Sequence, residues 1–415
     1  MKLIEEVEKY LYSLRSHKAN TDQKDMSLNS MWPLLERVGN PHMSLTVVHV
    51  AGTSGKTSTC VYIANLLKQA GFHTGLTISP HIESITERLQ IDGAPVSNEE
   101  FCKLFSQFIS LFENQPLKVT YFEFMIVFIL WSFVQRGVEV AIIETGLGGL
   151  YDGTNVCRLP NKICVITDIG LDHQEILGNT IEKIATQKAG IIHQSNSVFM
   201  YQKAPAVQQI FSGIVKKKDA KLFIVDEKPY DQSNRLTRYQ QRNWHLAHQV
   251  AKFFCEREGV TLPRSDVLGI TQSDIPGRMQ KVQKNGTLFI IDGAHNEQKA
   301  KAFIESLEDS IVKKSIPVIL AVKKGKDLHG LLKVLKPYVR VGICTQYRIA
   351  QDAFIASMSA NEVAAAVASL DIPALTTSSI EEAINEVLKL KEPVVLITGS
   401  LYMIGEALRV LKTTP

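Results

Sequence analysis

The sequence predicts an α/β protein of two domains, each built around a mostly parallel β-sheet. Two observations support this prediction. Short apolar runs rich in Val and Ile alternate with amphipathic segments of helical spacing, and the same alternation begins again in the last third of the chain. Continuous apolar strands separated by helices are typical of a parallel sheet covered on both faces. The length of 415 residues suits two or three domains, at roughly 100–200 residues each.

The predicted first domain begins with a strand at residues 46–50, which runs into a glycine-containing turn. The helix that follows carries its apolar residues between 63 and 70 on one face, with the spacing of an amphipathic helix. Ser97 is placed to begin a capping box at the start of a later helix. Residues 138–143 and 163–167 are apolar runs too short for helices, so we predict them to be strands.

The predicted second domain repeats this pattern, with strands at residues 288–291, 316–322 and 394–397. Ser379 is placed to cap the helix before the last of these strands. The turn-forming pair Pro276-Gly277 suits a hinge, so we expect domains at residues 1–280 and 281–415. Residues 201–240 are polar and weakly patterned, and we assign no element there.

Composition excludes several classes of protein. Lys and Arg exceed Asp and Glu by four, which is too small a surplus to indicate a nucleic-acid partner. The most apolar run, residues 124–134, is shorter than the roughly 20 residues that cross a bilayer. The acidic N-terminus does not have the pattern of a signal peptide. Six scattered cysteines without a C-x-x-C pair indicate reduced, mostly buried thiols and a cytoplasmic protein.

A phosphate-binding loop is the strongest chemical motif. The segment Gly52-Thr53-Ser54-Gly55-Lys56-Thr57-Ser58 follows a predicted strand and begins a predicted helix. Backbone N–H groups of such a loop close around phosphate oxygens, and the helix N-terminus adds partial positive charge. Lys56 would contact the terminal phosphates, and the Thr57 hydroxyl would bind Mg²⁺. Val50 stands where the usual pattern has glycine, so the motif is shortened. The alternative is a glycine-rich turn that binds no ligand.

Two ionisable side chains follow successive strands of the chain. Glu144 ends one strand, and His173 lies six residues after the next. The C-terminal edge of a parallel sheet is where ligands of such folds bind. A buried carboxylate needs a cationic partner, and nucleotide-bound Mg²⁺ would serve. The alternatives are a salt-bridged glutamate and a structural histidine.

Two further motifs are ambiguous from their residues alone. Lys188 lies near a predicted helix C-terminus, where a surface lysine is the expected interpretation. The loop Asp292-Gly293-Ala294-His295-Asn296 follows the first strand of the second domain. It either grips a nucleotide or forms a simple turn.

Together these segments resemble the dihydrofolate synthase/folylpolyglutamate synthase family of the Mur ligase superfamily. The resemblance runs in order over nearly the whole chain, in residues 11–14, 39–41, 49–53, 77–82, 87–88, 120–124, 144–149, 152–156, 172–173, 176–180, 188–192, 276–279, 292–296 and 398–402. It implies a Mur-ligase-like fold, in which a parallel-sheet phosphate-loop ATPase domain precedes a smaller Rossmann-like α/β domain.

The resemblance also implies roles for individual residues. The residues implied to bind ATP are Thr53, Ser54, Gly55, Lys56, Thr57, Ser58, Asn243, Arg278, Asp292, His295 and Asn296. Those implied to hold Mg²⁺ are Thr57, Ser79, Glu144, His173 and Lys188. Lys188 resembles the family's carbamylated lysine, and Lys56, His173 and Lys188 would be catalytic. Tyr121, Phe122 and Asp152 would lie near the pterin-bearing substrate.

The expected reaction uses ATP and Mg²⁺ to join L-glutamate to a folate or dihydropteroate through an acyl phosphate, with the second domain closing over ATP. Leu150 replaces a family arginine, and Thr86 replaces the usual asparagine. These changes leave the accepted folate form open. Thr57 is closer to the cell-wall Mur ligases, so a ligase for a cell-wall nucleotide or another polyglutamate acceptor is the first alternative. A nucleotide-dependent switch is the second. We expect a cytoplasmic monomer with no nucleic-acid or membrane partner.

Overall fold

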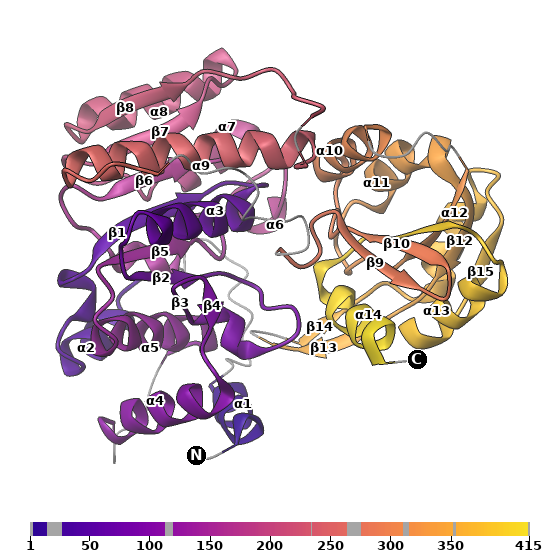
Figure 1. Ribbon diagram of the computed structural model, residues 1–415, viewed down its shortest axis with the longest axis horizontal. Coiled ribbons are helices and arrows are strands. Elements are labelled where there is room, and N and C mark those ends of the chain that lie inside the picture. Colours follow the sequence, from indigo (N-terminus) through magenta and orange to yellow (C-terminus); the bar gives the residue numbers. More distant parts are fainter. Residues whose placement is uncertain are drawn as a thin grey trace. The chain divides into compact units, whose positions relative to one another are not determined.

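The structure is a computed structural model, and it describes residues 3–14, 27–112, 119–233, 235–263, 275–309, 315–351 and 354–413. The chain divides into two compact units (Figure 1). The first unit comprises residues 1–229 and 242–266, and the second comprises residues 230–241 and 267–415. Our predicted boundary after residue 280 stays a prediction, and residues 267–280 group with the second unit.

The first unit is built on an eight-stranded sheet in the order β4-β3-β2-β5-β1-β6-β7-β8. Its strands are β1 (Thr46–Ala51), β2 (Thr74–Thr77), β3 (Gln90–Ile91), β4 (Ala94–Pro95), β5 (Val140–Glu144), β6 (Ile163–Ile166), β7 (Ser197–Tyr201) and β8 (Lys221–Val225). The six strands from β2 to β8 in this order are parallel, as predicted, whereas β3 and β4 form an antiparallel edge. Because β1 lies at the centre, the loop that follows it lies among the C-terminal ends of its neighbours.

Helices cover both faces of this sheet. The helices described here are α1 (Ile4–Ser13), α2 (Met31–Arg37), α3 (Lys56–Gln69), α4 (Asn98–Ser110), α5 (Tyr121–Gln135), α6 (Gln174–Leu177), α7 (Ile181–Ala189), α8 (Pro205–Lys217) and α9 (Arg238–Arg257). Residues 238–241, at the start of α9, group with the second unit. Helix α3 packs on β1, β2 and β5, while α5 packs against the other face, which carries Ala141 and Ile143. Ser97 caps α4 because its hydroxyl accepts a hydrogen bond from the Glu100 N–H, which is one half of the predicted capping box. The unassigned stretch 201–240 contains α8 and β8.

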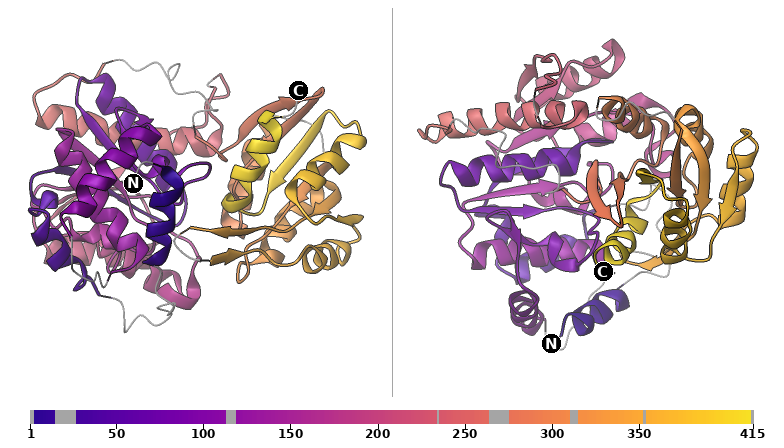
Figure 2. Two further views of the ribbon diagram at one scale, coloured as in Figure 1. Left: turned by 90° about the horizontal axis from the view of Figure 1, so that it is seen from below. Right: turned by 45° about the vertical axis from the view of Figure 1, so that its right-hand side comes forward.

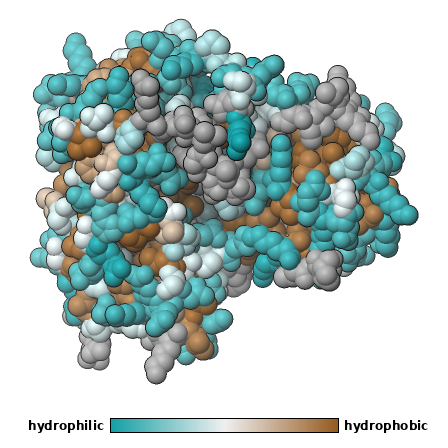
Figure 3. All heavy atoms as spheres, in the orientation of Figure 1, coloured by the Kyte–Doolittle hydropathy of each residue, from teal (hydrophilic) through white to brown (hydrophobic). Residues whose placement is uncertain are grey.

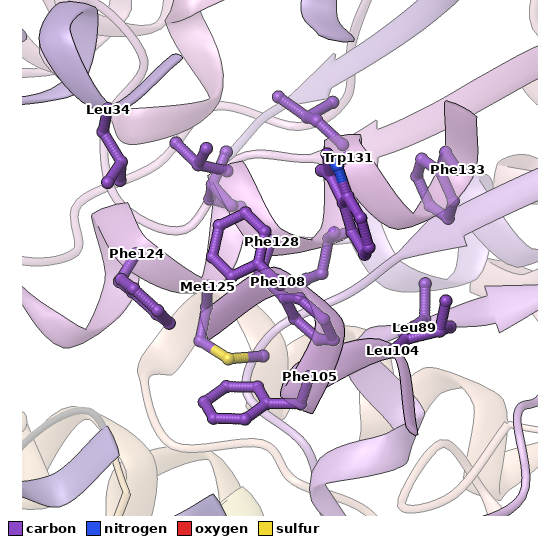
Figure 4. Close-up of a cluster of buried hydrophobic side chains, with 14 of the residues drawn as sticks. Leu34, Leu89, Leu104, Phe105, Phe108, Phe124, Met125, Phe128, Trp131 and Phe133 are labelled. Atoms are coloured by element: carbon purple, nitrogen blue, oxygen red, sulfur yellow. The ribbon is translucent and has the colours of Figure 1, made fainter. Parts of the chain in front are cut away.

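The core of the first unit is an aromatic cluster between α4 and α5 (Figure 4). The Phe108 ring centroid lies 5.2 Å from that of Phe124 and 5.4 Å from that of Phe128, both in edge-on geometry. Helix α5 is apolar around most of its circumference because it is buried on nearly all sides. Within the described residues, no helix has the length and apolar character that a bilayer crossing requires.

The second unit has a six-stranded sheet in the order β15-β12-β11-β16-β10-β9 and a separate hairpin, β13-β14. Its strands are β9 (Gln280–Lys284), β10 (Thr287–Ile291), β11 (Ile316–Leu320), β12 (Val339–Cys344), β13 (Arg348–Ala350), β14 (Phe354–Ala356), β15 (Ala374–Thr376) and β16 (Val394–Thr398). All neighbours in the larger sheet are parallel except β9, which pairs antiparallel with β10. The predicted strands of the second domain are therefore present.

Helices flank this second sheet as well (Figure 2). They are α10 (Glu297–Glu308), α11 (Leu328–Leu335), α12 (Ala360–Ala368), α13 (Ile380–Lys389) and α14 (Leu401–Thr413). Residues of α10, α11 and α12 share one apolar cluster with alternate residues of β10, β11 and β16. Ser379 caps α13 as predicted.

The surface and the cysteines have the character expected from the amino-acid composition, namely a mixed surface and reduced thiols. The face shown in Figure 3 mixes hydrophilic and hydrophobic residues over both units. All six cysteines are buried free thiols, as the sequence predicted.

Candidate active site

The phosphate loop connects β1 to α3 and is held by the segment that follows β6. The Thr53 N–H donates to the Asp168 carbonyl at 2.6 Å, and the Thr167 hydroxyl donates to the Ser54 carbonyl at 2.7 Å. Gly55 has φ 84°, in the left-handed region, and a Cβ there would lie 2.5 Å from Asn243 Oδ1. Glycine is therefore required at this position by both conformation and space. The loop is preorganised by contacts distant in sequence, and Asn243 lies over it.

Two lysines converge on this loop. Lys56 Nζ donates to the Gly52 carbonyl at 3.1 Å, and Lys188 Nζ donates to the same oxygen at 2.8 Å. The interpretation of Lys188 as a surface lysine, made from its residues alone, is wrong because only 4% of Lys188 is exposed. Helix α7 places it beneath the loop, and the role implied by the family resemblance stays a prediction.

Glu144 ends β5 directly beside the first turn of α3. Only 3% of it is exposed. It accepts hydrogen bonds from the Thr57 hydroxyl, at 2.9 and 3.2 Å to its two oxygens, and from the Ser79 N–H at 3.2 Å. The structure thus brings together three of the five residues that the resemblance implies as Mg²⁺ ligands.

This arrangement fits Mg²⁺. The ion prefers oxygen ligands and is commonly held by one or two carboxylates together with waters and substrate phosphates. A buried carboxylate beside a threonine hydroxyl supplies such oxygens. The described part of the chain contains no group of three or more His, Cys, Asp or Glu side chains able to hold a metal.

His173 lies at the N-terminus of the short helix α6, with φ 51°. Its ring nitrogens approach Asp172 Oδ1 at 3.9 Å and Glu175 Oε1 at 3.7 Å. A non-glycine residue in the left-handed region is uncommon and deserves a functional hypothesis. The metal-binding role of His173 remains a prediction.

The loop after Glu144 is held by Asp152. This carboxylate accepts from the Leu147 N–H at 2.6 Å and from the N–H of Thr154 at 3.0 Å, as well as from the Thr154 hydroxyl. Burial raises the pKa of Asp152, although these donors oppose the shift. Phe122 closes over the same loop, since a Cβ on Gly146 would lie 2.6 Å from its ring. Tyr121 is buried beside it at the start of α5.

One cluster was not predicted from the sequence. Asp168 receives two hydrogen bonds from Arg242 Nη1, at 2.6 and 2.7 Å, and Lys203 Nζ lies 3.5 Å away. The Arg242 guanidinium also stacks 4.2 Å from the Tyr201 ring centroid. The sequence offered two indications of this pair: Asp168 directly follows a predicted strand, and Arg242 directly precedes Asn243. The pair ties the segment behind the phosphate loop to α9.

The predicted nucleotide residues of the second unit form their own group. The Asp292 carboxylate accepts from Tyr239 Oη at 2.9 Å and from the Met279 N–H at 3.0 Å. Burial raises its pKa, and the charge of Arg278 opposes that shift. The His295 and Lys299 side chains meet at 2.9 Å, and Asn296 caps α10. The Asn296 side-chain oxygen is thus used to cap the N-terminus of α10.

These features define a class of protein. A family model described as "Mur ligase middle domain" matches residues 50–263, which include the phosphate loop, Glu144 and Lys188. A second model, described as "Dihydrofolate synthetase, C-terminal domain", matches residues 274–410. The chain is a Mur-type ligase.

Comparison with whole proteins narrows the class. The chain is 30% identical to the dihydrofolate synthase/folylpolyglutamate synthase of Bacillus subtilis, covering 93% of this chain and 95% of that protein. It is 28% identical to the dihydrofolate synthetase of Saccharomyces cerevisiae, over 93% and 98%. The chain belongs to the dihydrofolate synthase/folylpolyglutamate synthase family, as its sequence motifs predicted.

Solved structures show the same fold. The folylpolyglutamate synthase of Mycobacterium tuberculosis, solved with ADP and AMPPCP, superposes with a TM-score of 0.84 at 24% identity and 99% coverage of both chains. The apo form of the Lacticaseibacillus casei enzyme gives a TM-score of 0.78 at 27% identity, again over 99% of both chains. The predicted Mur-ligase-like architecture is confirmed.

Proposed function

We propose that this protein uses ATP to add L-glutamate to a folate, as a folylpolyglutamate synthase that also accepts dihydropteroate. The observation that carries the proposal is the hydrogen bond from the half-buried Thr57 hydroxyl to the buried Glu144 carboxylate at the phosphate loop, in a chain that belongs to this family. The pair supplies oxygens for nucleotide-bound Mg²⁺. The nucleotides named with the M. tuberculosis enzyme support ATP as the substrate.

The reaction proceeds in two steps. A substrate carboxylate attacks the γ-phosphorus of ATP, the bond to the bridging oxygen breaks, and ADP leaves. The glutamate amine then adds to the acyl carbon of the mixed anhydride, and phosphate leaves as the amine loses its proton. Phosphorylation is needed because a carboxylate is a poor electrophile. Mg²⁺ neutralises charge on the phosphates when bound.

The chain's own residues supply the rest of the charge compensation. Lys56 lies at the start of α3, where it can leave the Gly52 carbonyl and reach a phosphate oxygen. Glu144 orients the Thr57 hydroxyl, and Asn243 lies against Gly55. Lys188 would become a carboxylate-like ligand after addition of CO₂ to its amine. In the second unit, the residues that the family resemblance implies as ATP contacts are Arg278, Asp292, His295 and Asn296.

Phosphate release tests the proposal directly. The purified protein would be incubated with ATP, Mg²⁺ and L-glutamate against dihydropteroate, tetrahydrofolate and a cell-wall precursor. We expect release that depends on glutamate and on a pterin-bearing acceptor, with a product heavier by one glutamyl residue. Release with the cell-wall precursor alone would favour the other Mur-type ligases. Nucleotide binding without acceptor-dependent release would indicate a switch.

Two further expectations belong with this proposal. We expect a monomer, which light scattering would test. The buried free thiols suit a reducing compartment, so we expect the cytoplasm.

A further inference from the structure

A buried row of hydrogen bonds connects the central strand β1 to the loop that follows β5. His49 Nε2 lies 2.8 Å from the Thr154 hydroxyl, and both residues are fully buried. The Thr154 hydroxyl in turn donates to Asp152 Oδ1. Asp152 Oδ2 accepts from the Leu147 N–H at 2.6 Å. The row of hydrogen bonds therefore reaches from the central strand of the sheet to the loop of residues 145–150.

The direction of each bond follows from the number of available protons. The Thr154 hydroxyl has one proton and gives it to Asp152, so it must accept from His49. His49 Nε2 therefore carries a proton. Consistently, His49 Nδ1 has no hydrogen-bond partner among the described residues. Burial, Lys162 and His193 all hold the pKa of His49 well below its usual value. His49 is thus a fixed donor at neutral pH.

The row of hydrogen bonds ends beside Phe122, which is predicted to lie near the pterin-bearing acceptor. The Gly146 backbone lies between Asp152 and Phe122, because a Cβ there would be 2.6 Å from the Phe122 ring and 3.2 Å from Asp152 Oδ2. Strand register adds a second link, since His49 pairs with Ile143 and Val50 pairs with Glu144. Displacement of the loop would therefore move the surface under Phe122.

We propose that His49 and Thr154 are positioning residues for the pterin-bearing acceptor, which act by orienting Asp152 and, through it, the loop of residues 145–150 beneath Phe122. This inference rests on the proposed function and on the prediction that Tyr121 and Phe122 lie near the pterin-bearing acceptor. Both carboxylate oxygens of Asp152 accept hydrogen bonds, one from the Leu147 N–H and the other from Thr154. Asp152 therefore acts by fixing the backbone of the loop. The phosphate loop is held separately, by residues 167–170.

Matched variants separate positioning from general stability. Thr154→Val keeps the shape and removes the hydroxyl, whereas Thr154→Ser keeps the hydroxyl. His49→Asn loses the donor at Nε2, whereas His49→Gln retains an N–H near that place. Val207→Ala, on the buried face of α8, lowers stability in a different apolar cluster from the one that Phe122 packs against. We would measure kcat, KM for acceptor and for ATP, and hydrogen exchange of amides 145–150 in each full-length variant.

We expect Thr154→Val to raise the acceptor KM by about tenfold, on the scale of a lost buried hydrogen bond. The KM for ATP should stay within about twofold of the wild-type value. Exchange of the loop amides should become faster, and Thr154→Ser and Val207→Ala should behave as wild type in both readouts. If Thr154→Val fails to fold, His49→Asn compared with His49→Gln makes the same test.

Two results would overturn the inference. One is an unchanged acceptor KM with unchanged loop exchange in the donor-deficient variants. The other is an equal rise of both KM values, which would indicate a general structural role. A wild-type protein without acceptor-dependent phosphate release would contradict the proposed function instead, and the exchange experiment would still decide whether the row holds the loop.

Discussion

Lys56 and Lys188 donate hydrogen bonds to one and the same oxygen, the Gly52 carbonyl, at 3.1 and 2.8 Å. One lysine comes from the phosphate loop itself and the other from α7, 132 positions later in the numbering (188 − 56). Both amines therefore lie at the start of the phosphate loop, where each would attract an anionic group. The expected changes at this place are binding of a triphosphate at Lys56 and addition of CO₂ to the Lys188 amine.

The first prediction concerns Lys56. Lys56→Ala should lower kcat/KM for ATP-dependent ligation by about 10²-fold or more, the scale of one lost charge contact in a transition state. Lys68→Ala, an exposed lysine of the same helix, is the matched control and should leave the rate unchanged. Steady-state phosphate release measures both. Near-normal turnover by Lys56→Ala would refute its assignment.

The second prediction concerns Lys188. We expect a mass increase of one CO₂ on this side chain under native, CO₂-replete conditions, and activity that falls after removal of bicarbonate. Lys188→Ala should lower the rate by about 10²-fold, on the same transition-state scale. Lys183→Ala is the control, because Lys183 is an exposed residue of the same helix. An unmodified Lys188 in an active enzyme, with activity retained by Lys188→Ala, would remove it from the site.

The third prediction tests the metal ligands. Glu144→Gln and His173→Ala should each lower the rate by about 10²-fold and raise the Mg²⁺ concentration needed for half-maximal activity. The glutamine keeps the shape of the side chain and removes the charge. Glu175→Gln is the control, because Glu175 is 65% exposed. Titration of Mg²⁺ at fixed ATP is the measurement, and an unchanged requirement would contradict the ligand role.

The parts of the candidate site that are contiguous in the sequence could be predicted from the sequence. The phosphate loop and Glu144 were predicted because a strand, a glycine turn and a strand-end carboxylate are contiguous patterns. Lys188 was misjudged from its residues because its burial depends on a contact with Gly52, 136 positions away. The Asp168–Arg242 pair, separated by 74 positions, was missed for the same reason. Strands β3 and β4 have two residues each, too few to show alternation.

The fourth prediction concerns that pair. Asp168→Asn should raise the KM for ATP by about tenfold, because Arg242 no longer fixes the start of α9 where Asn243 lies over Gly55. The acceptor KM should change much less. Glu227→Gln is a matched control, since Glu227 contacts the same guanidinium at 3.0 Å but is 64% exposed. Exposed ion pairs contribute little, so this control should keep a normal KM. A normal ATP KM in Asp168→Asn would exclude the coupling.

The fifth prediction is a pH dependence of stability. His193 Nε2 lies 2.9 Å from Asn155 Oδ1, whose amide nitrogen donates to the carbonyls of Leu150 and Gly190. His193 must therefore donate. Burial, followed by the charges of Lys162, Arg158 and Lys218, lowers the pKa of His193 to about 3. In the unfolded chain this imidazole regains its ordinary pKa of about 6.5.

The sign of the effect follows from proton uptake on unfolding. Between about pH 6.5 and pH 3 the unfolded state holds a proton on His193 that the folded state lacks, so acid favours unfolding. The free energy of unfolding should fall as pH drops from 7 to 5. His193→Gln keeps an N–H donor and does not titrate, so its stability should fall less steeply, by at most about 1.4 kcal/mol per pH unit of difference. Urea unfolding at pH 7, 6 and 5 measures both slopes, and parallel curves would show that His193 takes up no proton on unfolding.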